Sequence, residues 1–323
     1  MKWPLDGVVT AAKKTARWHR SLHADQVGAP LHLNGRGKRI DVSSDIARAK
    51  IAVVAHVFYS DVWPQILESL NRIPMYFDVF VTVPVENYSS VGELVRRAFP
   101  QAQIYPTRNR GRDIAPFFEV VLRAQNIDTY TAICKIHTKK GIHEPDVWRY
   151  LLLKSVLGSD ELIADIVRGF IEDPTLGIVG ARDLYFSGSK FLGPNRFNVE
   201  RIVGAITGSL DFPLNWGFFA GTMFWIRPSL LDSLSKYVAD SLTFEENSKI
   251  NDGKIEHALE RVFGLLPLLA GHKIGLVETV GGKSGSQAFR VYESCPQPNR
   301  EEPLLYLSRK AEELRGKVFV PVS

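Results

Sequence analysis

Cysteine is scarce in this chain of 323 residues, which contains only Cys134 and Cys295. Two cysteines are too few for a disulfide framework, so a reducing compartment is expected. No apolar run approaches the length that spans a membrane, and the N-terminus lacks the apolar core of a signal peptide. We therefore expect a cytoplasmic protein, either free or attached peripherally to the cytoplasmic face of the inner membrane.

Several signatures of catalysis and metal binding are also missing. The sequence has no recognisable spacing of metal ligands and no Walker-type phosphate loop. It has no nucleophile elbow and no motif of a cysteine nucleophile. These absences argue against the common metal-site, P-loop and covalent-nucleophile classes.

The composition and charge of the chain leave room for an anionic partner. The chain is 45% hydrophobic and 23% charged, which is typical of a globular protein with a large core. Its formal net charge is +5 and its pI is about 9.1. This mild excess favours anionic partners, and phosphates, nucleic acid and acidic membrane surfaces all remain open.

Predicted strands alternate with predicted helices, which indicates βαβ units and an α/β fold. The pattern starts with the apolar run 51–59, which is typical of a central parallel strand. We predict strands at 77–84, 102–105, 130–140, 176–180 and 216–227, and helices at 63–72, 91–98, 114–125, 147–157, 161–172, 201–209, 254–263 and 303–317. The expected architecture is a GT-A-like, Rossmann-type, mostly parallel sheet flanked by helices, with helical extensions at both ends.

Three segments are expected along the chain. Residues 1–45 are predicted to be a basic helix and a linker, and the helix, at 1–25, would either lie on a membrane surface or pack on the domain. Residues 46–275 are the main domain, with a polar loop at 182–198. Residues 276–323 are an irregular segment, including 285–300, and the closing helix.

The stretch from Tyr130 to Gly141 combines an apolar strand with cationic side chains. Lys135, His137 and Lys139 lie two residues apart, so a strand puts them on one face, and Lys140 follows. Open α/β folds bind their ligands at the carboxyl edge of the sheet. The pattern therefore predicts a pyrophosphate site, and the alternative is a strand that runs into a solvated basic turn.

A second cationic cluster, Arg108-Asn-Arg-Gly-Arg-Asp113, precedes the helix at 114–125. Asp113 is a suitable N-cap, and a helix N-terminus offers unpaired amides to an anion. Arg110 and Arg112 add permanent charge beside the basic strand. The alternative is a capping residue with a solvated arginine turn.

The remaining candidates fall at other strand ends and on one helix. His56, Tyr59 and Thr82 end the first two strands and are assigned to the nucleoside. We expect an acceptor or sugar site at Asp113, Trp216, Gly221 and Arg261. Asp252 is the expected general base, with His257 beside it and Glu246 and Glu256 as rivals. Ordinary core packing, a helix cap and a helical ion pair remain the structural alternatives for these residues.

Together these motifs resemble the rhamnan synthesis protein F family, bacterial glycosyltransferases of cell-surface polysaccharide assembly such as O-antigen. The resemblance is carried, over about residues 50 to 265, by H-V-F-Y-S-D (56–61), R-N-R-G-R-D-I-A-P-F (108–117), K-I-H-T-K-K (135–140), W-G-F-F-A-G-T-M-F-W-I-R-P (216–228) and D-G-K-I-E-H-A-L-E-R (252–261). It implies transfer of a hexosyl or deoxyhexosyl residue, such as rhamnosyl, from a nucleoside-diphosphate sugar to a lipid-linked or polysaccharide acceptor.

The chain is also similar to the wider GT-A glycosyltransferases, but it departs from them at one position. Where those enzymes hold a metal with Asp-any-Asp, this chain has K-I-H-T-K-K at 135–140. Fixed cations can stabilise a leaving diphosphate as a metal does, so we expect a metal-independent transferase without a cofactor. The competing hypothesis is a non-catalytic module that binds a polyanion. Clustered rather than striped charge argues against nucleic acid as the partner.

Overall fold

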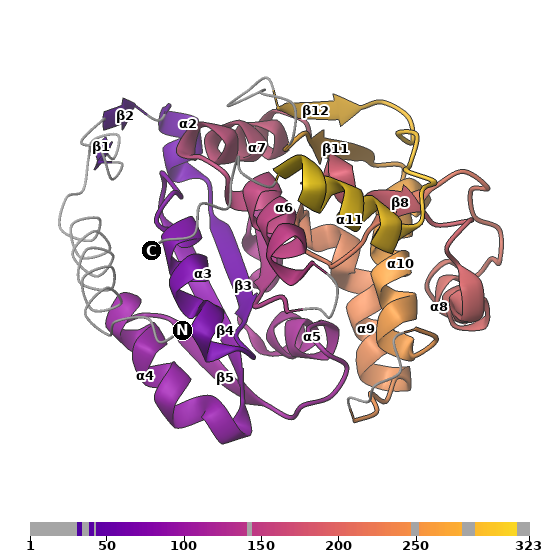
Figure 1. Ribbon diagram of the computed structural model, residues 1–323, viewed down its shortest axis with the longest axis horizontal. Helices are drawn as coiled ribbons and strands as arrows, with labels where there is room; N and C mark the ends of the chain where they lie inside the picture. The colour runs from indigo at the N-terminus through magenta and orange to yellow at the C-terminus, as the bar shows by residue number, and fades with distance from the viewer. Residues whose placement is uncertain are drawn as a thin grey trace.

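Apolar and β-branched residues make up the first central strand, β3 (Ile51–His56), in which every residue is buried. The structure is a computed structural model that describes residues 31–33, 39–41, 43–140, 144–246, 252–279 and 288–314. In this part of the chain, β3 lies inside an eight-stranded sheet with the order β12-β11-β7-β10-β6-β3-β4-β5 (Figure 1).

The sheet is mostly parallel. The strands that run in one direction are β3, β4 (Phe77–Pro84), β5 (Gln103–Thr107), β6 (Ala132–His137), β7 (Leu176–Ala181) and β11 (Lys273–Val277). Two strands run the other way, β10 (Phe224–Ile226) between β6 and β7, and β12 (Phe289–Tyr292) at one edge. The predicted α/β class with a mostly parallel sheet flanked by helices is confirmed.

Helices cover the sheet. One packed group comprises α3 (Trp63–Leu70), α6 (Pro145–Leu157), α7 (Asp160–Glu172) and α11 (Pro303–Leu314). A second comprises α5 (Ile114–Arg123), α8 (Arg196–Thr207), α9 (Asp232–Ser241) and α10 (Ile255–Leu269). The other helices are α2 (Ser44–Arg48) and α4 (Tyr88–Ala98), with short 3-10 turns η1 (Ser60–Val62), η2 (Val85–Asn87), η3 (Ile127–Thr129), η4 (Arg182–Leu184), η5 (Gly193–Asn195) and η6 (Pro228–Leu231).

The order of the strands creates a switch point between β3 and β6. From β3 the chain moves outward through β4 to β5, and it then crosses back through α5 to β6 on the other side of β3. Right-handed crossovers place α5 opposite α3 and α4. The carboxyl ends of β3 and β6 therefore lie at the switch point, which is the place where open α/β sheets bind ligands.

Three predicted segments are wrong in detail. The predicted strand 216–227 is two strands, β9 (Gly217–Phe219) and β10, because the chain turns between them at Gly221 and Thr222. The predicted loop 182–198 contains the buried strand β8 (Tyr185–Ser187), which pairs with β9. The segment 285–300, predicted to be irregular, contains β12, and the predicted boundary after residue 275 falls inside β11.

The N-terminal predictions are tested only in part. The predicted helix at 1–25 lies outside the described residues. The predicted linker at 26–41 includes a short antiparallel pair, β1 (Leu31–Leu33) with β2 (Arg39–Asp41).

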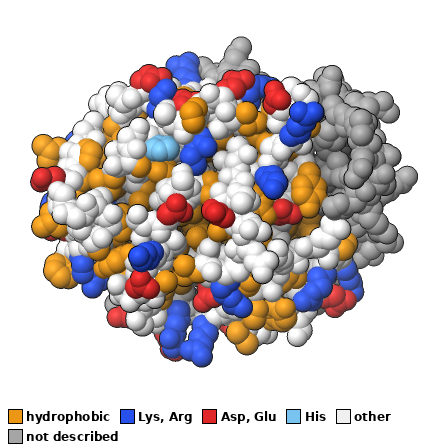
Figure 2. Space-filling model, turned by 180° about the vertical axis from the view of Figure 1, so that it is seen from behind, with side chains coloured by type: hydrophobic (Ala, Val, Ile, Leu, Met, Phe, Trp, Pro, Cys, Tyr) orange, Lys and Arg blue, Asp and Glu red, His pale blue; other side chains and the backbone are white. Residues whose placement is uncertain are grey.

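On the face shown in Figure 2, acidic and basic side chains are interspersed and form no continuous basic stripe.

Candidate functional site at the carboxyl edge of the sheet

The switch point places the ends of β3 and β6 side by side. His56 and His137 are paired in register at these ends. Thr138 joins the two strands beyond the pair, because its hydroxyl oxygen accepts hydrogen bonds from the backbone N–H groups of Phe58 and Tyr59, both at 2.9 Å. The loop after β3 is thereby held against the start of the basic segment.

Asp113 is the centre of the polar cluster at this edge. Its carboxylate accepts hydrogen bonds from the Lys135 ammonium and the Thr222 hydroxyl, each at 2.5 Å. Burial alone would raise the pKa of Asp113, but His137, which becomes protonated in the acidic range where a carboxylate titrates, the Lys135 charge and the two hydrogen bonds outweigh burial and hold the pKa well below its usual range. Asp113 is therefore an ionised carboxylate and makes no side-chain capping bond to α5.

Lys135 is fully engaged inside this cluster. Its side chain is 2% exposed, and besides Asp113 it binds the backbone oxygen and the hydroxyl of Thr222, each at 3.0 Å. The predicted face is observed, because His137 also approaches Asp113, at 3.7 Å. All three donors of its ammonium have protein acceptors, so Lys135 holds this cluster together, and its contact with a diphosphate stays a prediction.

His137 is neutral at physiological pH. Its Nε2 lies 2.7 Å from the backbone oxygen of Gly221, so this nitrogen carries the proton and donates it. Burial lowers the pKa of His137 to about 4, and the nearby Lys135 and Lys139 act in the same direction. His137 therefore fixes the turn at Gly221 and adds no positive charge to the site.

The turn between β9 and β10 has positive φ at two successive residues, and the second of them, Thr222, is strained. Gly221 has φ +93°, and a Cβ there would lie 2.8 Å from Trp148 Nε1. Thr222 has φ +50°, which is an outlier for a β-branched residue. Such backbone strain persists where surrounding contacts enforce it, and it is frequent at functional sites. Lys135, His137 and Asp113 supply those contacts here.

Lys139 and Lys140 extend beyond the buried cluster in different directions. The Lys139 ammonium lies 4.0 Å from the centre of the Trp148 ring. Burial lowers the pKa of Lys139, while Glu260 and Asp113 oppose this change. Lys140 is exposed, pairs with Asp61 and lies over the Tyr59 ring, 4.9 Å from its centre.

The arginine loop before α5 approaches the same edge. Gly111 has φ +60°, and a Cβ there would lie 2.5 Å from the Phe244 ring, so only glycine fits. Arg110 forms a bridge with Glu246, with 3.5 Å between the charged groups. Arg112 lies close enough to Lys139 and His257 to lower the pKa of each. The two predicted cationic clusters are therefore neighbours.

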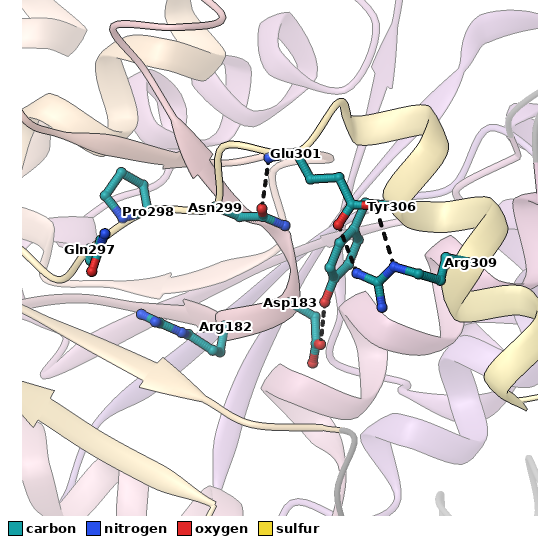
Figure 3. Close-up of a pocket in the computed structure, with 8 residues that line it drawn as sticks. All are labelled: Arg182, Asp183, Gln297, Pro298, Asn299, Glu301, Tyr306 and Arg309. Atoms are coloured by element: carbon teal, nitrogen blue, oxygen red, sulfur yellow. Dashed lines mark hydrogen bonds and ion pairs between the residues drawn. The ribbon is translucent and has the colours of Figure 1, made fainter.

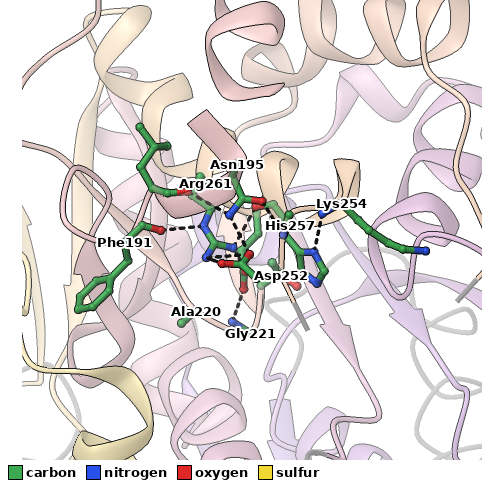
Figure 4. Close-up of polar contacts among 12 residues, drawn as sticks. Phe191, Asn195, Ala220, Gly221, Asp252, Lys254, His257 and Arg261 are labelled. Carbon is green, nitrogen blue, oxygen red and sulfur yellow. Dashed lines mark hydrogen bonds and ion pairs between the residues drawn. The ribbon is translucent and has the colours of Figure 1, made fainter. Parts of the chain in front are cut away.

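A second network lies at the start of α10 (Figure 4). Asp252 accepts a hydrogen bond from the Asn195 side-chain amide at 2.7 Å. It also forms an ion pair with Arg261 at 3.4 Å. Arg261 also binds Glu260 at 2.9 Å, and the other oxygen of Glu260 accepts from the backbone N–H of Gly221 at 2.8 Å. This chain of contacts links Asp252 to the strained turn. The Asp252 side chain is 40% exposed and open to a ligand.

The other acid–base candidates lie in different surroundings. His257 Nδ1 accepts from the backbone N–H of Lys254, and burial lowers its pKa to about 4. Glu256 is 1% exposed, and neither of its oxygens has a hydrogen-bond partner among the residues that the structure describes. The Glu246 side chain is 82% exposed. Of these acids and Asp252, only Asp252 combines partial exposure with contacts leading to Gly221.

Two nucleoside candidates and the tryptophan are covered. His56 Nδ1 and Thr82 Oγ1 lie 3.0 Å apart, with Thr82 0% and His56 8% exposed. Trp216 is 1% exposed and packs over Gly188, so it belongs to the core. Thr82 and Trp216 therefore present almost no surface to a ligand in this structure, and their assignments to the nucleoside and to the sugar stay predictions. Tyr59 remains partly exposed beside Lys140.

Sequence reasoning missed three residues of the site. Thr222, Asn195 and Trp148 contact the cluster or its network. Glu260 was not missed, since its helical spacing from His257 and Arg261 predicts that the three can meet, and Arg261 does bind Glu260. Thr222 carried no signal in the sequence, because its role depends on a backbone conformation that is rare for threonine.

No group of three or more metal-ligand side chains occurs within the described ranges. The helices of that same part of the chain are too short or too polar to cross a membrane.

Comparison with known proteins gives three findings. A family model described as "Rhamnan synthesis protein F" matches residues 37–272. Two proteins called "Uncharacterized protein WxcX", from Xanthomonas campestris pv. campestris strains B100 and ATCC 33913, are 30% identical over 261 residues, which is 79% of this chain. The match spans 37% of the length of these relatives. The 4-diphosphocytidyl-2C-methyl-D-erythritol synthase of Anaerococcus prevotii DSM 20548 aligns over 84% of this chain and all of its own, with 10% identity and a TM-score of 0.39.

Proposed function

Because the chain belongs to the rhamnan synthesis protein F family, we propose that it is a glycosyltransferase of bacterial polysaccharide synthesis. In this proposal it moves a hexosyl or deoxyhexosyl residue from a nucleoside-diphosphate sugar to a lipid-linked or polysaccharide acceptor. One observation carries the proposal. The arginine loop and the basic segment after β6 converge where the strand order reverses, and this place suits a diphosphate.

The side chains that bind the diphosphate are Lys139, Lys140, Arg110 and Arg112. Lys139 and Arg112 are neighbours, and Lys140 is exposed at the end of the same segment. Lys135, His137 and Asp113 act behind them, because together they hold the turn at Gly221 and Thr222. This buried turn supports the site from behind, with Tyr59 beside the nucleoside.

These cations take the role that a divalent metal has in other glycosyltransferases. Negative charge grows on the departing diphosphate during transfer, and fixed donors that need no rearrangement stabilise it. Lys139 is suited to this role because its charge is partly removed from water, where electrostatic interactions are stronger. No metal or cofactor is required in this scheme.

Asp252 removes the proton of the acceptor hydroxyl in an inverting displacement. Its partial exposure and its connection to Gly221 through Arg261 and Glu260 favour it over Glu246 and Glu256. His257 positions the start of α10 by accepting from the Lys254 backbone. Arg261 holds Asp252, and Asn195 supports it from η5.

A thermal-shift screen of nucleoside diphosphates and their sugars, with and without chelator, tests this function. A ligand that binds the folded chain and not the unfolded chain raises the melting temperature, by an amount that grows with its concentration relative to its Kd. We expect at least one nucleoside diphosphate to stabilise the protein equally in excess chelator. Stabilisation that chelator abolishes and manganese restores would show that the site needs a metal.

The competing hypothesis of a polyanion-binding module makes a different prediction. Polyanion affinity falls steeply with salt because many counterions are released, whereas a small diphosphate site loses little. The interspersed charges in Figure 2 give no support to a polyanion stripe on that face. A steep salt dependence together with no effect of any nucleotide would favour the binding module.

A further inference from the structure

A second cavity opens at the same edge of the sheet, beyond the carboxyl end of β7 (Figure 3). Its volume is about 380 Å³, which lies within the range of about 300–1,000 Å³ typical of ligand pockets. Its lining residues, all outside the cluster around Asp113, are Arg182, Asp183, Gln297, Pro298, Asn299, Glu301, Tyr306 and Arg309.

The walls of this cavity are fixed by backbone pairing and packing. The backbone N–H of Asn299 donates to the backbone oxygen of Tyr185, and the backbone oxygen of Asn299 accepts from the backbone N–H of Ser187, both at 2.8 Å. The Tyr306 ring packs edge-on against Phe186, with 5.6 Å between ring centres. The cavity is therefore formed before any ligand arrives.

Both acids of the cavity are neutralised by neighbouring residues. Asp183 accepts hydrogen bonds from the hydroxyls of Tyr306 at 2.5 Å and Thr279 at 2.7 Å, with Lys310 at 3.7 Å. Glu301 is paired with Arg309 at 2.7 Å. Neither acid is left to attract a cation.

Arg182 is the exception in this balance of charge. Its Nη1 is buried and has no hydrogen-bond partner, and no ion pair to this guanidinium occurs in the described part of the chain. Buried polar groups without partners are rare in folded proteins, and each calls for a missing partner or a function. A guanidinium binds a carboxylate or phosphate with two parallel hydrogen bonds.

We propose that this cavity binds a sugar unit that carries an oxyanion, either a carboxylate or a phosphate, with Arg182 contacting the anion. The side-chain amides of Gln297 and Asn299 line the same space and suit ring hydroxyls. The anionic part of this inference rests on the charges of the cavity, and the sugar part rests on the proposed function.

The ligand belongs to the acceptor glycan rather than to the donor. β7 is separated from β6 by β10 alone, so the two strand ends lie two strand spacings apart, or about 10 Å. An acceptor held at Arg182 can extend from there toward the turn at Gly221.

Ligand-observed NMR titrations of the full chain with glucose 1-phosphate, glucuronate and glucose test this proposal. We expect the two charged probes to bind at least tenfold more tightly than glucose. Arg182→Gln should weaken the charged probes about 10- to 100-fold, because a charge-assisted hydrogen bond is lost. Arg182→Lys, which keeps the charge but not the fork, should lose less. The tighter of the two charged probes identifies the oxyanion.

Two controls separate this cavity from the donor site. Arg97→Gln removes an exposed arginine from α4 that pairs with Glu93. This variant should bind all three probes as tightly as the wild type does. Lys139→Gln combined with Lys140→Gln should lower uridine diphosphate affinity and leave probe binding at Arg182 intact. Equal affinities in wild type and a folded Arg182→Gln variant, or glucose binding as tightly as glucuronate, would overturn the proposal. A chain that binds no nucleoside diphosphate but keeps Arg182-dependent binding would overturn the donor site alone.

Discussion

At the scale of single residues, the main change from sequence to structure concerns Lys135. Its spacing from His137 and Lys139 correctly predicted a shared face. The spacing could not show that Asp113 lies opposite, because the two residues come from different elements 22 positions apart. Burial of both groups converts a cation expected to face a ligand into one half of an internal ion pair.

Replacing Lys135 tests this internal role. Lys135→Met keeps the length of the side chain but leaves Asp113 as an unpaired buried charge, so stability should fall by about 3–5 kcal/mol. The double variant Lys135→Met, Asp113→Leu should recover part of this loss. Urea unfolding measures both effects. A single variant as stable as wild type would show that Asp113 and Lys135 are not a buried pair.

Asp252 is the residue on which the proposed proton transfer depends. Asp252→Asn keeps the size of the side chain and its contact with Asn195 while removing the basic oxygen, so turnover should fall by roughly 10²–10⁴-fold. Donor affinity should be nearly unchanged. Steady-state transfer assays together with nucleotide calorimetry measure the two quantities. Near-normal turnover would move the role to Glu246 or Glu256, or indicate a retaining mechanism.

At the scale of elements, the β9–β10 turn is the feature that sequence patterns could not give. Aromatic and apolar residues on both sides of Gly221 predict a single strand. The chain instead reverses there through two residues of positive φ, and β10 enters the sheet antiparallel. The parallel strands β3, β4, β6 and β7 were predictable because their continuous apolar runs are long and separated by helices.

The Thr222 hydroxyl ties this turn to Asp113. Thr222→Val keeps the shape of the side chain but removes the donor, so about 1–3 kcal/mol of stability should be lost. Transfer should fall as the turn loosens. Thr222→Ser retains the hydroxyl and serves as the matched control, with transfer close to wild type. Thermal unfolding and turnover report the two effects. Equal behaviour of the Val and Ser variants would show that the hydroxyl has no part in the site.

At the scale of the whole molecule, three buried histidines make stability depend on pH. Burial lowers the pKa of His56 to about 3 and the pKa values of His137 and His257 to about 4. The unfolded chain, in which histidine titrates near 6.5, binds more protons than the folded chain below that pH. Stability should therefore be constant above pH 7 and fall as the pH drops below about 6.5.

The expected loss is up to about 1.4 kcal/mol per pH unit for each of the three histidines between pH 6.5 and 4. Unfolding by urea at pH 7.5, 6.0 and 5.0 measures it. His56→Gln removes one titrating group, so the free energy of unfolding should change less steeply with pH, by about the contribution of one histidine. A free energy of unfolding that does not change between pH 7.5 and 5.0 would mean that these histidines are not buried in neutral form.

Calorimetry of nucleoside diphosphates with the double variant Lys139→Gln, Lys140→Gln tests diphosphate binding at this edge most directly. Each lost charge-assisted hydrogen bond should cost about 1.5–3 kcal/mol of affinity. Turnover should fall further, because charge on the departing phosphate is larger in the transition state than in the bound donor. The melting temperature should stay close to wild type, since both lysines lie outside the buried cluster. Unchanged affinity and turnover in a well-folded double variant would contradict diphosphate binding by the basic segment.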